Sequence, residues 1–406
     1  MPLVAGSVAD LARSPELRAP LDWFRRERAW INEQHLKLCR VAAPTFLEQK
    51  RAEWMAERFR ELGWESRLDR SGNVVASLPG RRESPTVAVT AHLDTVLAPR
   101  SSDEIKLSGD GRFLGPGVSD NGAGLAALLA IAAAWNAAPP LPEAQLAPVL
   151  IANVGEEGEG NLSGMRFLCR DVNSTRPRAF LVLDGPSTDH ITCRALASRR
   201  FEVTVNGPGG HSWSDYGAGN PIHTLSRVIA EFTSAVTTSA TDPAAPRSSF
   251  NFGLIQGGTS INCIPTEARA KIDLRSEKAE RIDEMASLLA ASVVQAAEME
   301  NNRATGGRVI ARLKEIGSRP GGELQEGATI LSSLRAVDTF LGIKSHLDCS
   351  STDANIPLSM GIPAVSIGAG GQGGGAHTPG EWFHPEGREL GLRRVLLALC
   401  LLLLAE

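Results

Sequence analysis

The stretch Thr-Val-Ala-Val-Thr-Ala-His-Leu-Asp, residues 86–94, begins as a short apolar run and ends in a histidine and an aspartate. Three more apolar segments have this form: 149–154 runs into two glutamates, 180–183 into an aspartate, and 364–367 into a glycine-rich loop with a histidine. Helical patterns separate the four segments. Apolar strands alternating with helices predict an α/β fold with a mostly parallel sheet flanked by helices, whose ligands bind beyond the carboxyl ends of the strands.

The order of elements changes in the middle of the chain. Strand, helix, strand, strand, helix and strand patterns follow one another at 201–205, 221–236, 250–255, 268–274, 279–299 and 308–313. This β-α-β-β-α-β order predicts an inserted ferredoxin-like α+β domain over residues 198–314. We therefore predict a discontinuous catalytic domain formed by residues 1–197 and 315–406.

Three further segments have clear patterns. Residues 21–62 are predicted to be mostly helical with a break near Pro44, and the Pro-rich stretch Ala137–Pro148 is predicted to be a loop after the helix Gly124–Trp135. The longest apolar run, Val395–Ala405, is shorter than the roughly 18 to 20 residues that span a bilayer. It predicts a buried final helix.

Composition excludes several classes of partner. The 406 residues contain 42 Lys plus Arg and 46 Asp plus Glu, a net charge of −4, so there is no basic field for nucleic acid or an anionic membrane. Six cysteines without a CxxC pair predict a reduced, cytoplasmic protein. Charged residues in the first 18 positions replace the apolar run of a secretory signal, so export is not expected.

The end of the first strand and a glycine-rich loop before a helix offer candidate ligands. His92 and Asp94 are two residues apart, so in an extended segment they point to the same side. Asp120 lies in Gly-Pro-Gly-Val-Ser-Asp-Asn-Gly, residues 115–122, directly before a helix. It is either an N-cap of that helix or a carboxylate that bridges two metal ions, and the fragment alone leaves both readings open.

Adjacent carboxylates follow the second strand. Glu156 and Glu157 repel each other unless one is protonated or a cation compensates them. One of them then binds metal while the other takes a proton from water. Glu159 allows the alternative of a solvated acidic loop. Asp184 and His377, read alone, are a turn aspartate and a surface-loop histidine, but together these residues match the ligands of zinc, cobalt or manganese in a co-catalytic pair.

Taken together, these motifs resemble the co-catalytic metallopeptidases and deacylases of metallopeptidase family twenty. That family includes aminoacylase, acetylornithine deacetylase, succinyl-diaminopimelate desuccinylase, glutamate carboxypeptidase and peptidase T. The resemblance rests on His-Leu-Asp at 92–94, Gly-Pro-Gly-Val-Ser-Asp-Asn-Gly at 115–122, Gly-Glu-Glu-Gly at 155–158, Gly-Gly-His-Ser at 209–212, Asn262 with Arg275, and Ser-Thr-Asp-Ala-Asn at 351–355 before His377.

The resemblance implies a zinc-exopeptidase-like catalytic domain with two divalent metal ions per chain, zinc first and cobalt or manganese as alternatives. One metal would be held by His92, Asp120 and Asp184, and the other by Asp120, Glu157 and His377. Asp94 would hydrogen-bond the second nitrogen of His92, which fixes the ring. Glu156 would be the general base that moves a proton from water to the leaving nitrogen.

The resemblance also implies that the inserted domain serves as a lid and as a dimerisation domain. His211 would stabilise the oxyanion in a neighbouring subunit's site, which implies a homodimer. Asn262 and Arg275 would contact the substrate's carbonyl and carboxylate. Without the resemblance, His211 reads as a turn residue and Arg275 as an exposed strand-end salt bridge.

These implications lead to one functional hypothesis with two alternatives. Asp184 stands where family members carry Asp or Glu, and Asp tends to accompany the peptidases. We therefore expect a cytoplasmic di-metal hydrolase, an exopeptidase acting on di- or tripeptides. The alternatives are an N-acyl-amino-acid deacylase and a non-catalytic relative that binds metal and a peptide-like ligand. The remaining histidines match no motif and are expected to be structural or surface residues: His35, His190, His223, His346 and His384.

Overall fold

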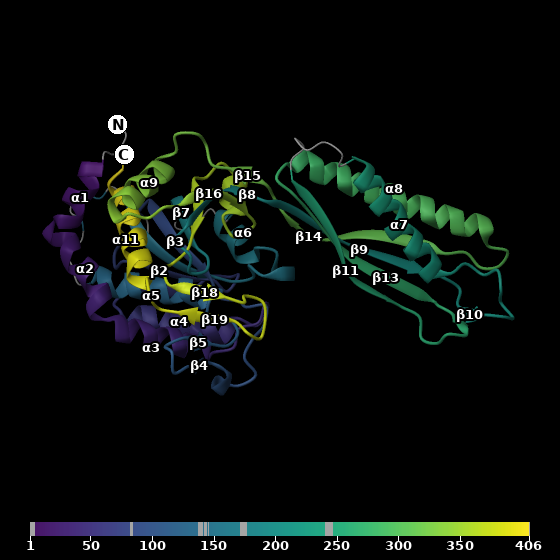
Figure 1. Ribbon diagram of the computed structural model, residues 1–406, viewed down its shortest axis with the longest axis horizontal. Coiled ribbons are helices and arrows are strands. Elements are labelled where there is room, and N and C mark those ends of the chain that lie inside the picture. The colour runs from purple at the N-terminus through teal and green to yellow at the C-terminus, as the bar shows by residue number, and fades with distance from the viewer. Residues whose placement is uncertain are drawn as a thin grey trace. The chain divides into compact units, whose positions relative to one another are not determined.

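The computed structural model describes residues 5–81, 84–136, 141, 144, 146–170, 177–239 and 247–405. The chain forms two compact units, one built from Met1–Ala195 with Gly322–Glu406 and the other from Leu196–Gly321 (Figure 1). The second unit begins two residues before the expected position 198 and ends seven residues after 314. The predicted loop at 137–148 lies largely outside the described residues.

A nine-stranded sheet forms the centre of the first unit. Its order is β1-β2-β6-β3-β7-β17-β8-β15, with β16 also paired to β8. The strands are β1 (Glu65–Leu68), β2 (Val74–Ser77), β3 (Thr86–His92), β6 (Ala147–Asn153), β7 (Pro177–Leu183), β8 (His190–Ala195), β15 (Gly322–Glu323), β16 (His346–Ser350) and β17 (Ala364–Ile367). The neighbours β6, β3, β7 and β17 are parallel, whereas β1, β2 and β15 pair antiparallel. The sheet is therefore mixed, with a parallel central part and a further parallel pair of β16 with β8.

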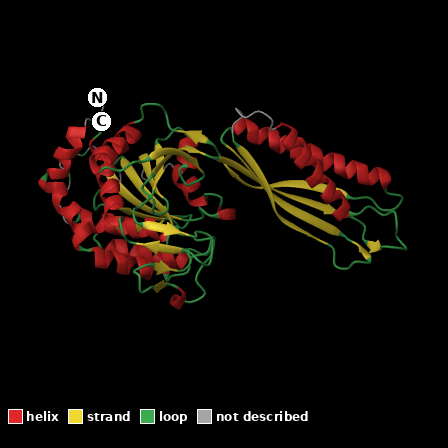
Figure 2. Ribbon diagram, in the orientation of Figure 1, coloured by secondary structure: helices red, strands yellow, loops and turns green. Residues whose placement is uncertain are grey.

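Helices cover this sheet, and the predicted α/β class is confirmed (Figure 2). They are α1 (Ala5–Arg13), α2 (Pro15–Arg26), α3 (Arg28–Cys39), α4 (Gln49–Glu61), α5 (Gly122–Trp135), α6 (Ser163–Arg170), α9 (Thr329–Leu341), α10 (Asn355–Ser359) and α11 (Arg388–Leu404). Both α5 and α11 pack against β3 and β6. All residues of α5 are apolar, and so is the second half of α11 from Val395 on, because these segments are buried between the sheet and other helices. Within the described residues, no helix is long and apolar enough to cross a membrane.

A small second sheet lies in the same unit. Its order is β18-β19-β5-β4, with β4 (Lys106–Leu107), β5 (Phe113–Leu114), β18 (Gln372–Gly374) and β19 (Trp382–His384). All of its pairs are antiparallel. This sheet joins the loop before Asp120 to the loop that carries His377, two segments far apart in the sequence.

The second unit has the predicted ferredoxin-like order. Its elements are β9 (Ala197–Asn206), α7 (Pro221–Ser239), β11 (Ser248–Gly257), β13 (Glu267–Ser276), α8 (Ala279–Arg303) and β14 (Ile310–Arg319), with a two-stranded ribbon of β10 (Gly210–His211) and β12 (Cys263–Ile264). The antiparallel sheet has the order β11-β13-β9-β14, and Figure 2 shows both helices on one face of it. Alternate residues of β13 are buried against these helices, as the period of two requires.

Candidate metal centre

The polar residues that end the central strands meet at one edge of the sheet. His92 is the last residue of β3, Glu156 and Glu157 follow β6, and Asp184 follows β7. His377 comes from the loop after β18. Three groups of side chains have ligand atoms within 4.8 Å of one another: His92 with Asp120 and Asp184, Asp120 with Glu157 and His377, and His92 with Glu156 and Glu157. The first two groups are the ligand sets that the family resemblance implied.

Asp120 lies between the two histidines. Its Oδ1 is 3.0 Å from Nε2 of His92, and its Oδ2 is 3.1 Å from Nε2 of His377. The Oε1 atom of Glu157 is 2.8 Å from the same His377 nitrogen, and the Oδ1 atom of Asp184 is 3.9 Å from Nε2 of His92. Each oxygen of Asp120 thus faces a different ligand group. Asn121, not Asp120, caps α5 by accepting the Gly124 N–H at 3.1 Å, so the N-cap reading of Asp120 is wrong.

The electrostatics of this cluster fit bound cations. Hydrogen bonds with Asp120 and Glu157 raise the pKa of His377 to about 10. Burial lowers the pKa of His92, but the neighbouring carboxylates of Asp120, Asp184 and Asp94 outweigh burial and hold that pKa well above its usual value. The carboxylates therefore demand positive charge at both imidazoles, which two divalent ions would supply. The donor set of imidazole nitrogens and carboxylate oxygens is the one that zinc, cobalt and manganese accept.

Asp94 differs from its expected role. Nδ1 of His92 is 2.9 Å from the main-chain oxygen of Asp94, whereas the Asp94 carboxylate is 3.6 Å from that nitrogen. The main-chain carbonyl thus fixes the ring. The fully buried carboxylate instead accepts the main-chain N–H groups of Glu156 at 3.0 Å and Glu157 at 2.9 Å, and the hydroxyl of Thr45 at 3.0 Å. Asp94 therefore positions the two glutamates.

Glu156 lies beside the ligands and is buried, with 5 % of its surface exposed. One of its carboxylate oxygens is within 4.8 Å of the ligand atoms of His92 and Glu157. A buried strand leads into this segment, and its main-chain amides are bonded to Asp94. Glu156 is thus a buried side chain on a held main chain, in contrast to the alternative of a solvated acidic loop.

Asp353 is a buried acid to which sequence reasoning assigned no role. It lies in the Ser-Thr-Asp-Ala-Asn motif, and its Oδ2 accepts the side-chain N–H of Asn153 at 2.6 Å. Its Oδ1 is buried and has no hydrogen-bond partner among the described residues. Burial, with the nearby Asp94 and Asp184, outweighs the attraction of His92 and raises the pKa of Asp353 to about 7. The Ser-Thr-Asp-Ala-Asn motif was the available sequence signal for Asp353. Its hydrogen-bond partner Asn153, however, lies 200 residues earlier in the chain.

His35 has the structural role that the sequence left open. Its Nε2 donates to the main-chain oxygen of Val118 at 2.7 Å, and its Nδ1 accepts from the guanidinium of Arg388 at 2.6 Å. Arg can only donate and a carbonyl can only accept, so these partners fix a neutral ring with its proton on Nε2. Burial and the charge of Arg388 lower the pKa of His35 well below its usual value. His35 therefore anchors the loop that carries Asp120.

In the second unit, the candidate residues lie in two separate places. His211 and Asn262 are exposed on the β10–β12 ribbon, where His211 pairs with Cys263. Arg275 is paired with Ser198 near the far end of β13, and its Nε donates to Asp273 at 2.6 Å. Ten residues of β13 span roughly 30 Å. Within this unit, the structure brings His211 and Asn262 together and does not bring Arg275 to them.

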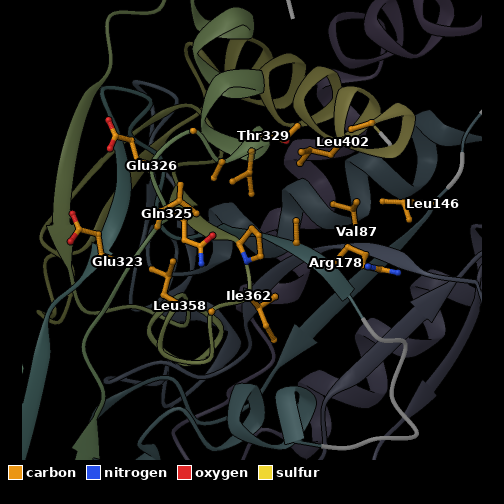
Figure 3. A pocket seen from close by; sticks show the side chains of 18 residues that line it. Val87, Leu146, Arg178, Glu323, Gln325, Glu326, Thr329, Leu358, Ile362 and Leu402 are labelled. Carbon is orange, nitrogen blue, oxygen red and sulfur yellow. The ribbon is translucent and has the colours of Figure 1, made fainter. Parts of the chain in front are cut away.

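A cavity of about 670 Å³ lies elsewhere in the first unit (Figure 3). Its walls include Val87 near the start of β3, Ala179 in the first part of β7, and Leu402 of α11. These positions are at the amino ends of the central strands, whereas the candidate ligands are at the carboxyl ends. The lining is mainly aliphatic and contains no histidine. The cavity is thus separate from the candidate metal centre.

Two family models match parts of the chain. Residues 73–204 match the peptidase family M28, and residues 197–299 match a peptidase dimerisation domain. The first match spans three of the strand ends described above and the loop of Asp120. The second covers most of the ferredoxin-like unit.

Individual proteins are also similar. A succinyl-diaminopimelate desuccinylase from Paracoccus denitrificans is 29% identical over 63% of this chain and 71% of its own length. A cytosol non-specific dipeptidase from Escherichia coli is 26% identical over 62% of this chain and 54% of its own. A crystal structure from Bacillus subtilis, described as a dinuclear metal-binding peptidase from the M20 family, is 15% identical with a TM-score of 0.65 and covers 93% of this chain and 99% of its own. This last likeness shows the shared fold.

Proposed function

Because this chain belongs to the M20 metallopeptidase family, we propose that it is an exopeptidase of di- or tripeptides that works with two bound metal ions. The observation that carries the proposal is the arrangement of Asp120, whose two oxygens face His92 and His377 at 3.0 and 3.1 Å. A carboxylate placed in this way can bridge two metal ions, one through each oxygen. A structural zinc site would instead enclose one ion with four ligands.

The metal ligands are proposed to be His92, Asp120 and Asp184 for one ion and Asp120, Glu157 and His377 for the other. We propose zinc, with cobalt and manganese as ions that the same donors accept. When bound, such a pair polarises the scissile carbonyl and activates water near neutral pH. Asp94 holds the main chain of Glu157, so the ligand is fixed relative to His92.

Glu156 is proposed to be the general base. Its buried carboxylate lies beside the ligand groups, and its main chain is held by Asp94. In this position it takes a proton from the attacking water and delivers it to the leaving nitrogen. A protein that only binds metal and peptide has no use for this additional carboxylate, which argues against the non-catalytic alternative.

His211 is proposed to stabilise the oxyanion in the site of a partner subunit. Its Nδ1 accepts the main-chain N–H groups of Trp213 at 3.2 Å and Ser214 at 3.4 Å. The proton of the neutral ring is then on Nε2, in an exposed side chain that can donate to an oxyanion. Asn262 on the same ribbon is proposed to contact the substrate carbonyl of that site.

Arg275 is proposed to bind the substrate carboxylate, as a planar guanidinium does through paired hydrogen bonds. It lies at the opposite end of the second unit from His211. We therefore assign the two residues of one chain to different active sites of a homodimer, formed through the second unit. The protein is proposed to be cytoplasmic, in agreement with its six free cysteines.

A deacylase of N-acyl amino acids is the second candidate, because the most identical of the relatives above is a desuccinylase. One experiment separates the two candidates. Metal-loaded protein and its Glu156→Gln variant are incubated with a pooled library of dipeptides, tripeptides and N-acyl amino acids, and products are identified by mass spectrometry. Cleavage of peptides alone supports the exopeptidase, and cleavage of acylated amino acids alone supports the deacylase. No cleavage after reloading with zinc, cobalt or manganese contradicts both.

A further inference from the structure

The loop that carries Asp120 is held by a carboxylate from a distant part of the chain. The main-chain N–H groups of Gly117, Ser119 and Asp120 all donate to the side chain of Glu381, at 2.6, 2.7 and 2.8 Å. Glu381 is buried, with 3 % of its surface exposed. Hydrogen bonds to an ionised acceptor are the strong ones, and three of them converge here on one side chain.

Glu381 also ties this loop to the second ligand loop. It is four residues after His377, and its main-chain N–H donates to Thr378 O at 3.3 Å. Its main-chain oxygen accepts the N–H of Gly115 at 3.0 Å. Both the main chain and the side chain of Glu381 therefore connect the segment of His377 to the segment of Asp120. This connection fixes the separation of 3.1 Å between Oδ2 of Asp120 and Nε2 of His377.

Other groups hold the same loop from its carbonyl side. His35 donates to Val118 O at 2.7 Å, and the thiol of Cys39 is 3.5 Å from Gly117 O. These contacts keep the loop in place as a whole. Glu381 differs because it accepts the main-chain N–H of Asp120 itself, the residue whose carboxylate would lie between two ions. Its effect is therefore expected at the metals and not only in the stability of the fold.

We propose that Glu381 is a positioning residue that fixes Asp120 in the orientation that bridges the two metal ions. The inference rests on the proposed two-metal function and adds a residue outside both ligand sets. Its loss should weaken binding of the metal pair, and activity should recover in part when the metal concentration is raised. Loss of a residue that acts directly on the substrate would not be rescued by more metal.

The test is a titration of the metal-free protein with Co²⁺, followed by visible absorption, on the parent and on Glu381→Gln. The amide keeps one acceptor but places a donor against a main-chain N–H, so at least one of the three hydrogen bonds is lost. The parent should bind two ions. Glu381→Gln should bind its second ion at least tenfold more weakly, and its kcat should fall at least tenfold at low Co²⁺ with little change in KM. The matched control is Glu386→Gln, an exposed glutamate of the same segment, which should bind cobalt like the parent.

The outcomes separate this inference from the proposed function. If the parent never binds two ions, the proposed function itself fails. If the parent binds two and Glu381→Gln binds them with the same affinity, Glu381 is only a structural residue and the inference is wrong, even if the variant melts at a lower temperature. If Glu381→Gln does not fold, Glu381→Asp decides, because it keeps the charge and shortens the reach. Weaker second-site binding by that variant supports the inference, and parental affinity overturns it.

Discussion

The Oδ1 atom of Asp94 accepts the main-chain N–H of Glu156 at 3.0 Å, although 62 residues separate the two in sequence. This bond joins the carboxyl end of β3 to that of β6. The proposed base is therefore placed by the same segment that supplies the ligand His92. The main-chain oxygen of Asp94, and not its carboxylate, contacts Nδ1 of His92.

Replacing this carboxylate should disturb the base and not only the ligand. Asp94→Asn turns one acceptor into a donor that faces an N–H group or the Thr45 hydroxyl. We expect kcat to fall by about 10- to 100-fold, as for other residues that orient ligands. Steady-state kinetics on zinc-loaded protein measures this change. The exposed Asp103→Asn is the matched control, and equal kcat values for the two variants would contradict the assignment.

Removing the base should separate binding from turnover. Glu156→Gln should lower kcat by about two to four orders of magnitude, the usual contribution of a positioned acid or base. Two metal ions per chain should remain bound, which elemental analysis measures. Glu159→Gln, an exposed glutamate of the same segment, should keep parental activity. An active Glu156→Gln protein would exclude Glu156 as the base.

A shared active site predicts complementation between subunits. Glu156→Gln and His211→Ala homodimers should each be nearly inactive, because one lacks the base and the other the oxyanion donor. Mixed dimers contain one site in which both groups are intact. Subunit exchange should therefore restore part of the activity, measured after incubation of the two variants together. Activity that stays at the level of the separate variants would show that each chain works alone.

The buried His35 predicts a pH dependence of stability. Its pKa is lowered in the fold, where Arg388 and Cys39 are its charged and titratable neighbours. In the unfolded chain, His35 takes up a proton near pH 6.5, whereas in the folded chain it stays neutral at that pH. The stability that the neutral ring contributes is therefore fully present above pH 6.5 and is lost as the pH falls below it. Uptake of this one proton contributes about 1.4 kcal/mol per pH unit to the slope of the unfolding free energy against pH.

Urea unfolding of the parent and of His35→Gln between about pH 5 and pH 8 measures this contribution. The variant has no titrating ring at position 35. The slope of its unfolding free energy against pH should therefore be smaller, by up to the contribution of one proton. His346→Gln removes an exposed histidine and serves as the control. Equal slopes for His35→Gln and the parent would mean that the folded state accepts the proton.

The central strands and their polar ends were predictable because each is a continuous sequence feature. A buried apolar run such as Val149–Asn153 followed by Glu156 and Glu157 places acids at a sheet edge without reference to any other segment. The antiparallel flanks were not predicted. Their strands β1 and β15 are short and partly exposed, so they lack an apolar run.

Glu381 and Asp353 were missed for a different physical reason. Glu381 is bonded to amides more than 260 residues earlier in the chain, and Asp353 to Asn153, 200 residues earlier. A main-chain N–H carries no sequence signal, because every residue except proline has one. The acids proposed to face metal were recognisable because they follow apolar strands or lie in the quoted motifs, whereas the contacts of Glu381 with main-chain amides become visible only in the folded structure.

The division of the first unit into two stretches of chain affects the order in which the centre forms during synthesis. His92, Asp120, Glu157 and Asp184 leave the ribosome before the whole second unit, and His377 leaves after it. One ligand group can assemble early, while the group with His377 must wait. Until the second unit has been made, a nascent chain can therefore assemble only the first group.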